Sequence, residues 1–342
     1  MRARWLWLVL AALLAAPAVA GASRVALASA FLVEFLSEGR LRPLSSWTSL
    51  PDVRRLTAGR PEPPAPVDLY VRRGLPRPAG LVLVHGITEH GKGDPRLIAA
   101  AELLARAGWA VAVPTVRGLT ELRLRTEDAR AVTASIDLLT TAGYRPVALL
   151  AVSLGAAPAV LAAVPGGRDG ARVSAVLLLG GYASARELLR YTLTGAYAFG
   201  PERGRRPTDE ASIALFARAN PELVDARGRR LVDNRDPAAV DGLLAALSPE
   251  AQRLLTELSP ETHIGRLAAP LYLIHGVDDP VVPFTESLRL ADVGRDAGRR
   301  VRVALAGSVG HVESGPRNRP TELWQLWATW YAFWLDSARP PD

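Results

Sequence analysis

The stretch ALLAVSLGAAPAV, residues 148–160, decides how the rest of the chain is interpreted. The apolar residues Ala148 to Val152 predict a short buried strand, and the small residues Gly155 to Ala163 predict a helix directly after it. Ser153 therefore lies in the turn between them. A serine at that place is either the N-cap of the helix or the nucleophile of a tight strand-turn-helix elbow.

The residues on either side of Ser153 fit the elbow with one departure. Strand and helix nearly touch at such a turn, so the residues two before and two after the serine must be small. The usual pattern is Gly-x-Ser-x-Gly, whereas this chain has Ala151 and Gly155. One extra methyl group is tolerable there, and a larger side chain is not.

The composition narrows the class of protein. The 342 residues are 49% hydrophobic, enough for one large domain with an insertion or for two ordinary domains. The chain has no cysteine, which excludes disulfides, thiol catalysis and zinc-thiolate sites. A histidine acting as catalytic base must be one of five, namely His85, His90, His263, His275 and His311.

The basic charge does not indicate a nucleic-acid partner. The net charge of +7 comes almost entirely from arginines scattered along the chain, and Lys92 is the only lysine. No basic stripe interleaved with aromatic residues is present, so we expect no nucleic acid as partner. Such positive charge is more consistent with attraction to an anionic lipid surface.

The first 36 residues predict a membrane segment. Arg2 and Arg4 precede an uncharged apolar run from Trp5 to Ala22, which is long enough to span a bilayer and also has the pattern of an export signal. Both alternatives place the rest of the chain on the non-cytoplasmic side. The apolar pattern resumes from Phe31 to Leu36, which favours a retained signal-anchor, transmembrane or interfacial helix over residues 1–36. Secretion after signal cleavage and a buried core helix are the alternatives.

Residues 37–66 are rich in Arg and Pro and predict an extended linker, with residues 53–57 as an alternative edge strand. The globular domain is expected over residues 67–342. Strands are expected at residues 67–72, 81–84, 110–113, 147–152, 173–179, 271–275 and 301–305, and helices at residues 95–107, 126–142, 156–163, 284–297 and 322–335.

This alternation of apolar strands and amphipathic helices predicts the α/β class, with a mostly parallel central sheet covered by helices on both faces. Between Gly181 and Leu267 only helical patterns are found. Residues 182–267 therefore predict a helical lid inserted into the sheet domain.

The chain resembles the α/β-hydrolase fold superfamily, of the serine esterase and lipase type. Four landmarks occur in the family's order: the strand end His85-Gly86, the elbow at Ser153, the stretch LIHGVDDPVVP at residues 273–283, and Gly310-His311 after the last strand. The run His85 to His90 is also similar to the strand-end motif of monoacylglycerol lipases. The family's Asp-x-Arg-Gly-His-Gly stretch is only half present, within residues 115–119.

The resemblance implies a catalytic triad. Ser153 is then the nucleophile, His311 is the base that takes its proton, and an aspartate orients the imidazole. The family's acid stands three residues after the glycine that ends the strand, here Gly276, which implies Asp279. Asp278 is the competing candidate, although its place favours a turn residue.

The resemblance also implies an oxyanion hole made of two backbone N–H groups, those of Ile87 and Leu154. His85, Gly86 and Gly155 would support the surrounding loops.

The sequence therefore predicts a serine hydrolase that cleaves carboxylic esters through an acyl-enzyme, with a small-molecule or lipid ester as substrate and with no cofactor or metal. Acyl transfer, peptide hydrolysis and thioester cleavage are alternatives on the same triad, because fold does not select among them. A non-catalytic, membrane-tethered binding domain of the same fold is the alternative from another class.

Overall fold

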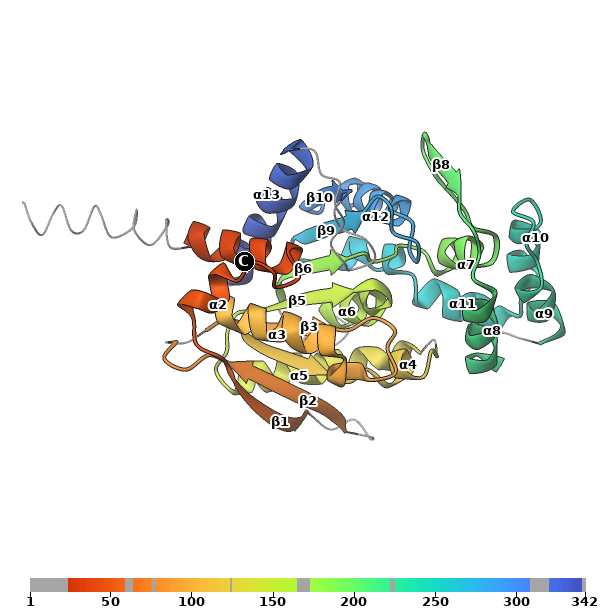
Figure 1. Cartoon of the computed structure of the whole chain (residues 1–342). Helices are drawn as coiled ribbons and strands as arrows, with labels where there is room; N and C mark the ends of the chain where they lie inside the picture. The colour runs from red at the N-terminus through yellow and green to blue at the C-terminus, as the bar shows by residue number, and fades with distance from the viewer. Residues whose placement is uncertain are drawn as a thin grey trace, which may run out of the picture.

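The computed structural model describes residues 24–58, 64–75, 78–123, 125–164, 173–221, 225–307 and 320–339. An eight-stranded sheet crosses the molecule (Figure 1), in the order β1-β2-β4-β3-β5-β6-β9-β10. Its strands are β1 (Asp52–Ala58), β2 (Ala65–Val71), β3 (Gly80–Val84), β4 (Ala110–Pro114), β5 (Val147–Val152), β6 (Val173–Leu179), β9 (Leu271–Gly276) and β10 (Val301–Ala306).

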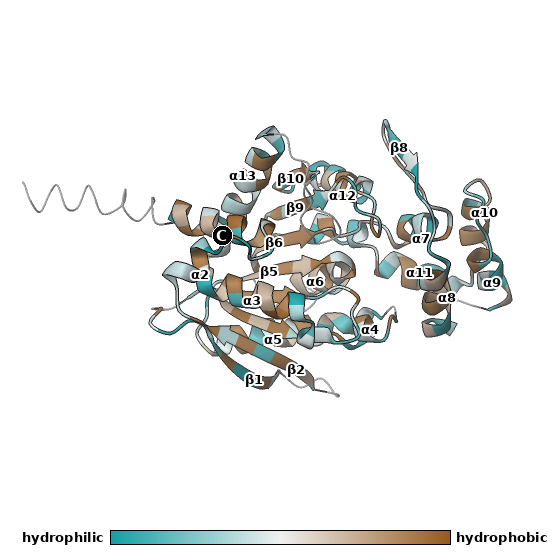
Figure 2. Ribbon diagram, viewed as in Figure 1, coloured by the Kyte–Doolittle hydropathy of each residue, from teal (hydrophilic) through white to brown (hydrophobic). Residues whose placement is uncertain are grey.

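The sheet is parallel from β4 to β10, while β2 pairs antiparallel with both β1 and β4. Every residue of β3, β4, β6 and β9 is buried. Figure 2 shows strands β5 and β6 as mostly hydrophobic. Strands buried on both faces form continuous apolar runs, which is why the sequence located them closely. The predicted fold class is confirmed.

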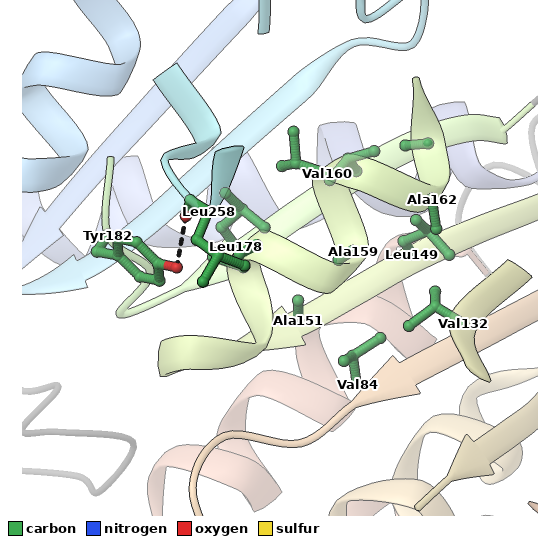
Figure 3. Close-up of a cluster of buried hydrophobic side chains, with 14 of the residues drawn as sticks. Val84, Val132, Leu149, Ala151, Ala159, Val160, Ala162, Leu178, Tyr182 and Leu258 are labelled. Carbon is green, nitrogen blue, oxygen red and sulfur yellow. Dashed lines mark hydrogen bonds between the residues drawn. The ribbon is translucent and has the colours of Figure 1, made fainter. Parts of the chain in front are cut away.

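Helices cover both faces of the sheet. Helices α5 (Ala129–Thr141), α6 (Ala156–Ala163) and α12 (Thr285–Asp296) contribute to one hydrophobic cluster, and Figure 3 shows part of its packing around Ala151 and Val160. Helices α3 (Pro95–Ala107) and α13 (Pro320–Ser337) contribute to the cluster on the other face, together with a helix over residues 24–36. The Asp94 side chain caps α3 by accepting a hydrogen bond from the backbone N–H of Arg96.

The insertion between β6 and β9 lies beyond the carboxyl ends of the strands (green and teal in Figure 1), and we call it the lid. It contains α7 (Ala185–Thr194), β7 (Ala196–Phe199), β8 (Glu202–Arg205), α8 (Glu210–Ala219), α9 (Ala226–Val232), α10 (Val240–Ala245) and α11 (Pro249–Glu257). The lid is mainly helical as expected, but the hairpin β7–β8 was not predicted. Its strands have only four residues each, too few to establish a two-residue period.

The N-terminal helix, residues 24–36, packs on the sheet domain. The Phe31 ring stacks on Trp330 of α13 at 4.3 Å, and Trp330 Nε1 donates a hydrogen bond to the carbonyl of Ala28. Ala28, Ala30 and Phe31 are buried in the same cluster as α3 and α13. For residues 24–36 the expected signal-anchor, transmembrane or interfacial helix is therefore corrected, and the alternative of a helix packed on the core holds there.

The expected linker over residues 37–66 is also corrected. It contains α2 (Pro43–Trp47), whose Leu44 is fully buried, and β1, which pairs with β2 along its whole length. The alternative of an edge strand at residues 53–57 is therefore confirmed. β1 is an edge strand with Arg54 and Arg55 exposed to solvent. Charged residues on edge strands are common, because they discourage pairing with other chains. The arginines of this edge strand give it the composition of a linker, which explains the incorrect prediction.

The expected membrane-spanning run, Trp5 to Ala22, lies outside the described residues. Within the described part of the chain, no helix combines the length and the apolar character needed to cross a bilayer.

Candidate active site

Ser153 lies at the sharp turn between β5 and α6, with a backbone φ of +52°. Residues other than glycine rarely adopt this left-handed conformation, which costs about 1–3 kcal/mol, so the surrounding packing must hold it. Gly155 is part of that packing, because a Cβ there would lie 2.5 Å from the carbonyl oxygen of His85. Ala151 is fully buried, so its methyl group is accommodated. An ordinary N-cap serine has extended backbone, so the conformation of Ser153 is that of the elbow.

The loop after β3 approaches the elbow closely. A Cβ on Gly86 would lie 3.0 Å from the Cβ of Ser153 and 3.6 Å from its Oγ. Ile87 follows Gly86 directly, and Leu154 is the middle residue of the helical turn Ser153–Gly155. Ile87 and Leu154, the two predicted oxyanion residues, are thus the chain neighbours of Gly86 and Ser153, which approach each other closely here.

The His85 side chain holds the loop after β3 in place through both ring nitrogens. Its Nδ1 lies 2.6 Å from the carbonyl oxygen of Gly86, and its Nε2 accepts a hydrogen bond from the backbone N–H of Val116 at 2.9 Å. Because the carbonyl can only accept, the proton is on Nδ1 and the ring is neutral. Burial lowers the pKa of His85, which favours the same neutral form. His85 is therefore a support for the loop, as expected.

The half-present Arg-Gly motif forms the next layer of this support. Arg117 begins the short helix α4 (Arg117–Thr120), and Asp128 Oδ1 accepts a hydrogen bond from the backbone N–H of Gly118 at 3.0 Å. A Cβ on Gly118 would lie 2.0 Å from the other carboxylate oxygen of Asp128, so only glycine fits. Burial raises the pKa of Asp128 to about 6. The motif thus holds Val116 in place to bind His85.

The two candidate acids differ sharply in environment. Asp279 is 1% exposed, and its Oδ1 accepts hydrogen bonds from the backbone N–H groups of Val281 (2.8 Å) and Val282 (3.0 Å). Its Oδ2 lies 3.5 Å from Nε2 of His275. The side chain of Asp278 is 80% exposed. Of the two carboxylates, Asp279 is held in one orientation, and an acid that orients an imidazole needs this property.

Three further side chains hold the turn that carries Asp279. His275 Nε2 donates to the carbonyl of Val282, and its Nδ1 lies 2.7 Å from the Ser287 hydroxyl. Arg206, at the end of the lid hairpin, donates to the carbonyls of residues 277, 278 and 279 at 2.6–3.0 Å. The Tyr191 hydroxyl donates to the carbonyl of Pro280. The sequence indicated neither Arg206 nor Tyr191, because no local pattern predicts a contact across 71 to 89 residues.

The predicted base, His311, lies outside the described residues, between β10 and α13. Of the other histidines, His90 is exposed, and His263 is half-buried with Nε2 2.7 Å from the carbonyl of Glu257. In the described part of the chain, no three His, Asp or Glu side chains are grouped so that they could hold a metal ion.

Ser153 lines a cavity of about 1330 Å³. The predicted oxyanion residues Ile87 and Leu154 also line it, as does Tyr182, whose hydroxyl donates to the carbonyl of Leu258 (Figure 3). The cavity extends from the elbow along the face of the sheet that α3 and α13 cover. A strained, buried serine beside a large cavity is the geometry of a nucleophile with a substrate site.

Residues 81–325, more than half of the chain, match the family model described as "Alpha/beta hydrolase family". The chain belongs to the α/β-hydrolase family. No curated protein matches this hydrolase significantly.

Solved structures of similar fold include both peptidases and esterases. An acylaminoacyl peptidase from Pyrococcus horikoshii has a TM-score of 0.57 at 16% identity, over 87% of this hydrolase and 43% of the peptidase. A puromycin-hydrolyzing peptidase from Mycobacterium tuberculosis has a TM-score of 0.54 at 18% identity, over 85% and 40% of the two chains. Est1E from Butyrivibrio proteoclasticus has a TM-score of 0.52 at 14% identity, over 83% and 98%. The hydrolase spans less than half the length of the peptidases, and these likenesses concern the fold.

Proposed function

We propose that this hydrolase cleaves carboxylic esters through an acyl-enzyme, with Ser153 as nucleophile, His311 as base and Asp279 as the acid that orients it. The observation that carries the proposal is the left-handed backbone of Ser153, which directs a buried serine toward a cavity. A neutral hydroxyl is a weak nucleophile, so its proton must be removed during attack. His85 and His275 are both engaged with backbone groups, and His311 follows the last strand in the family's order.

Each step uses groups of this chain and water. Ser153 Oγ attacks the ester carbonyl while the imidazole of His311 takes the hydroxyl proton. The N–H groups of Ile87 and Leu154 stabilise the negative oxygen of the tetrahedral intermediate. The imidazolium then protonates the leaving alcohol, and the acyl group stays on Ser153. Water, deprotonated by the same imidazole, attacks the acyl-enzyme and releases the acid.

A fluorophosphonate probe and a panel of esters and amides test the proposal. We expect Ser153 to be labelled and p-nitrophenyl esters to be cleaved, and both activities to be lost in Ser153→Ala and His311→Gln. Faster cleavage of amides or thioesters than of matched esters would replace the ester assignment by a peptidase or thioesterase. A folded protein that is neither labelled nor active would instead support the binding-domain alternative.

We also propose that residues 1–23 tether the hydrolase to a membrane with the catalytic domain on the non-cytoplasmic side. The support is the uncharged run from Trp5 to Ala22 behind two arginines. We expect the full chain to remain with membranes after a carbonate wash. A soluble product with a new N-terminus near Gly21 would show secretion instead.

A further inference from the structure

The floor of the cavity consists of two rows of apolar side chains on one face of the sheet. Leu83, Leu150 and Leu177 lie in register across β3, β5 and β6. The second row is Val152, Leu179 and Ile274, across β5, β6 and β9. Successive rows on one face are about 7 Å apart, and the second row is adjacent to Ser153. Five of these six side chains are at most 8% exposed, so the rows form a closely packed base under the cavity. A chain bonded to the serine would run inward above this base.

The walls come from helices that lie along this face. The lining follows α3 from Pro95 to Arg106, a length of about 18 Å. Leu326 and Trp330 line the cavity from α13. The N-terminal helix contributes four apolar side chains, namely Phe31, Leu32, Phe35 and Leu36. This helix, which precedes the first strand, is therefore a wall of the same cavity that contains Ser153.

The buried charged groups Glu34, Asp94 and Arg106 in the lining already have partners. Asp94 accepts hydrogen bonds from the Thr88 hydroxyl and the backbone N–H of Arg96. Glu34 accepts hydrogen bonds from the backbone N–H and the hydroxyl of Ser45. Arg106 donates to the carbonyls of Thr48 and Ser45. Because these charges are satisfied within the protein, the inner cavity offers a ligand mainly apolar surface. An acyl chain suits such a surface, whereas a charged or sugar-like group would lose its hydration there.

The size of the cavity points to a long chain. Ligand pockets usually have volumes of roughly 300–1000 Å³, and this cavity exceeds that range. An acetyl group would fill only a small part of this volume.

We propose that this cavity binds the long apolar acyl chain of a lipid-type ester, and that the N-terminal helix sets the chain length it accepts. The inference rests on the proposed esterase function for its substrate, but acyl-chain binding can be measured without catalysis. Phe35 of the N-terminal helix and Ala100 of α3, both half-buried in the lining, are then specificity-determining residues that face the chain, remote from the ester bond.

The test uses two variants, one in α3 and one in the N-terminal helix, and a matched control. Ala100→Trp fills the cavity from α3 without removing any packing, because Ala100 is half-buried in the lining. Phe35→Ala widens it from the N-terminal helix. Val33→Trp is the control, since Val33 is 43% exposed and is not among the described lining residues. kcat/KM is measured for acetyl, butyryl, octanoyl and palmitoyl esters.

In the wild type, kcat/KM should rise with chain length, by up to about fourfold for each methylene that is buried. Ala100→Trp should lower kcat/KM for octanoyl and palmitoyl esters at least tenfold and leave that for the acetyl ester within twofold. Phe35→Ala should weaken the preference for long chains, and Val33→Trp should change nothing. A flat chain-length profile that none of the variants alters would overturn the inference.

Calorimetry of palmitate binding to Ser153→Ala separates this inference from the proposed function. Binding that Ala100→Trp abolishes and Val33→Trp preserves supports the acyl site even if no ester is cleaved. Cleavage of short esters without palmitate binding would leave the esterase proposal intact and refute the acyl site.

Discussion

Gly155→Ala tests the geometry of the elbow directly. The new Cβ would lie 2.5 Å from the carbonyl oxygen of His85 and 3.1 Å from that of Val84. Both are backbone atoms at the end of β3. Either this strand end or the start of α6 must therefore move by about 0.9 Å for the new Cβ to reach an ordinary contact distance of 3.4 Å. His85 leads directly into the loop that carries Ile87, so this movement displaces one proposed oxyanion donor relative to Ser153. Overpacking of this kind costs about 1–3 kcal/mol in stability, and loss of one oxyanion donor lowers kcat by about a hundredfold to a thousandfold.

The assay is kcat on a short p-nitrophenyl ester, together with the midpoint of thermal unfolding. Gly93→Ala is the matched control, because Gly93 lies eight residues after His85 and a Cβ there would meet no atom within 4 Å. We expect Gly155→Ala to fold with a lowered unfolding midpoint and a strongly reduced kcat, and Gly93→Ala to match the wild type. A Gly155→Ala enzyme with kcat within twofold of the wild type would refute the reasoning that links the elbow to Ile87.

Three further predictions concern the residues around the site. Asp279→Asn should lower kcat by about ten-thousandfold, because an amide in this position stabilises the wrong imidazole tautomer. Asp278 is exposed, so kcat of Asp278→Asn should stay within a few-fold of the wild type. Equal effects of the two variants on kcat in steady-state assays would disprove the assignment of the acid. Asp128, whose buried carboxyl has a pKa of about 6, keeps its proton in the folded state between about pH 4 and 6 and loses it on unfolding, so stability falls as pH rises through this interval. Asp128→Asn should remove that fall and gain at most about 3 kcal/mol at pH 8 in urea unfolding, and an unchanged pH profile would contradict this account. Arg206→Ala should lower kcat more than KM by loosening the turn of Asp279, while Ala at the exposed Arg203 should have no effect; a change confined to KM would assign Arg206 to substrate binding.

Most of the fold could be predicted from the sequence because its signals are local. The helix over residues 156–163 and the strands 147–152 and 173–179 were predicted with the bounds that the structure has. Strands buried on both faces leave continuous apolar runs, and amphipathic helices between them leave a period of 3.6 residues. Weakly patterned elements were harder to predict. β1 is an arginine-bearing edge strand, and the hairpin β7–β8 is too short to show a period.

The candidate site was predictable where its residues sit in a motif. Ser153 and Gly155 belong to the elbow, and the spacing from Gly276 favoured Asp279 over the exposed Asp278. Contacts between distant parts of the chain could not be predicted. The N-terminal helix has the composition of a membrane segment, and only the tertiary structure places Phe31 against Trp330.

The attachment of Arg206 and Tyr191 to the turn of Asp279 has a consequence for the modularity of this enzyme. The lid, which lines the cavity, also supplies hydrogen-bond donors for the turn of the proposed acid, so we expect that neither can be exchanged without the other. A chimera that carries the lid of another α/β-hydrolase would need equivalent hydrogen-bond donors. Without them, we expect the turn of the proposed acid to be poorly aligned. We therefore expect grafts that retain residues 191 and 206 to be the active ones.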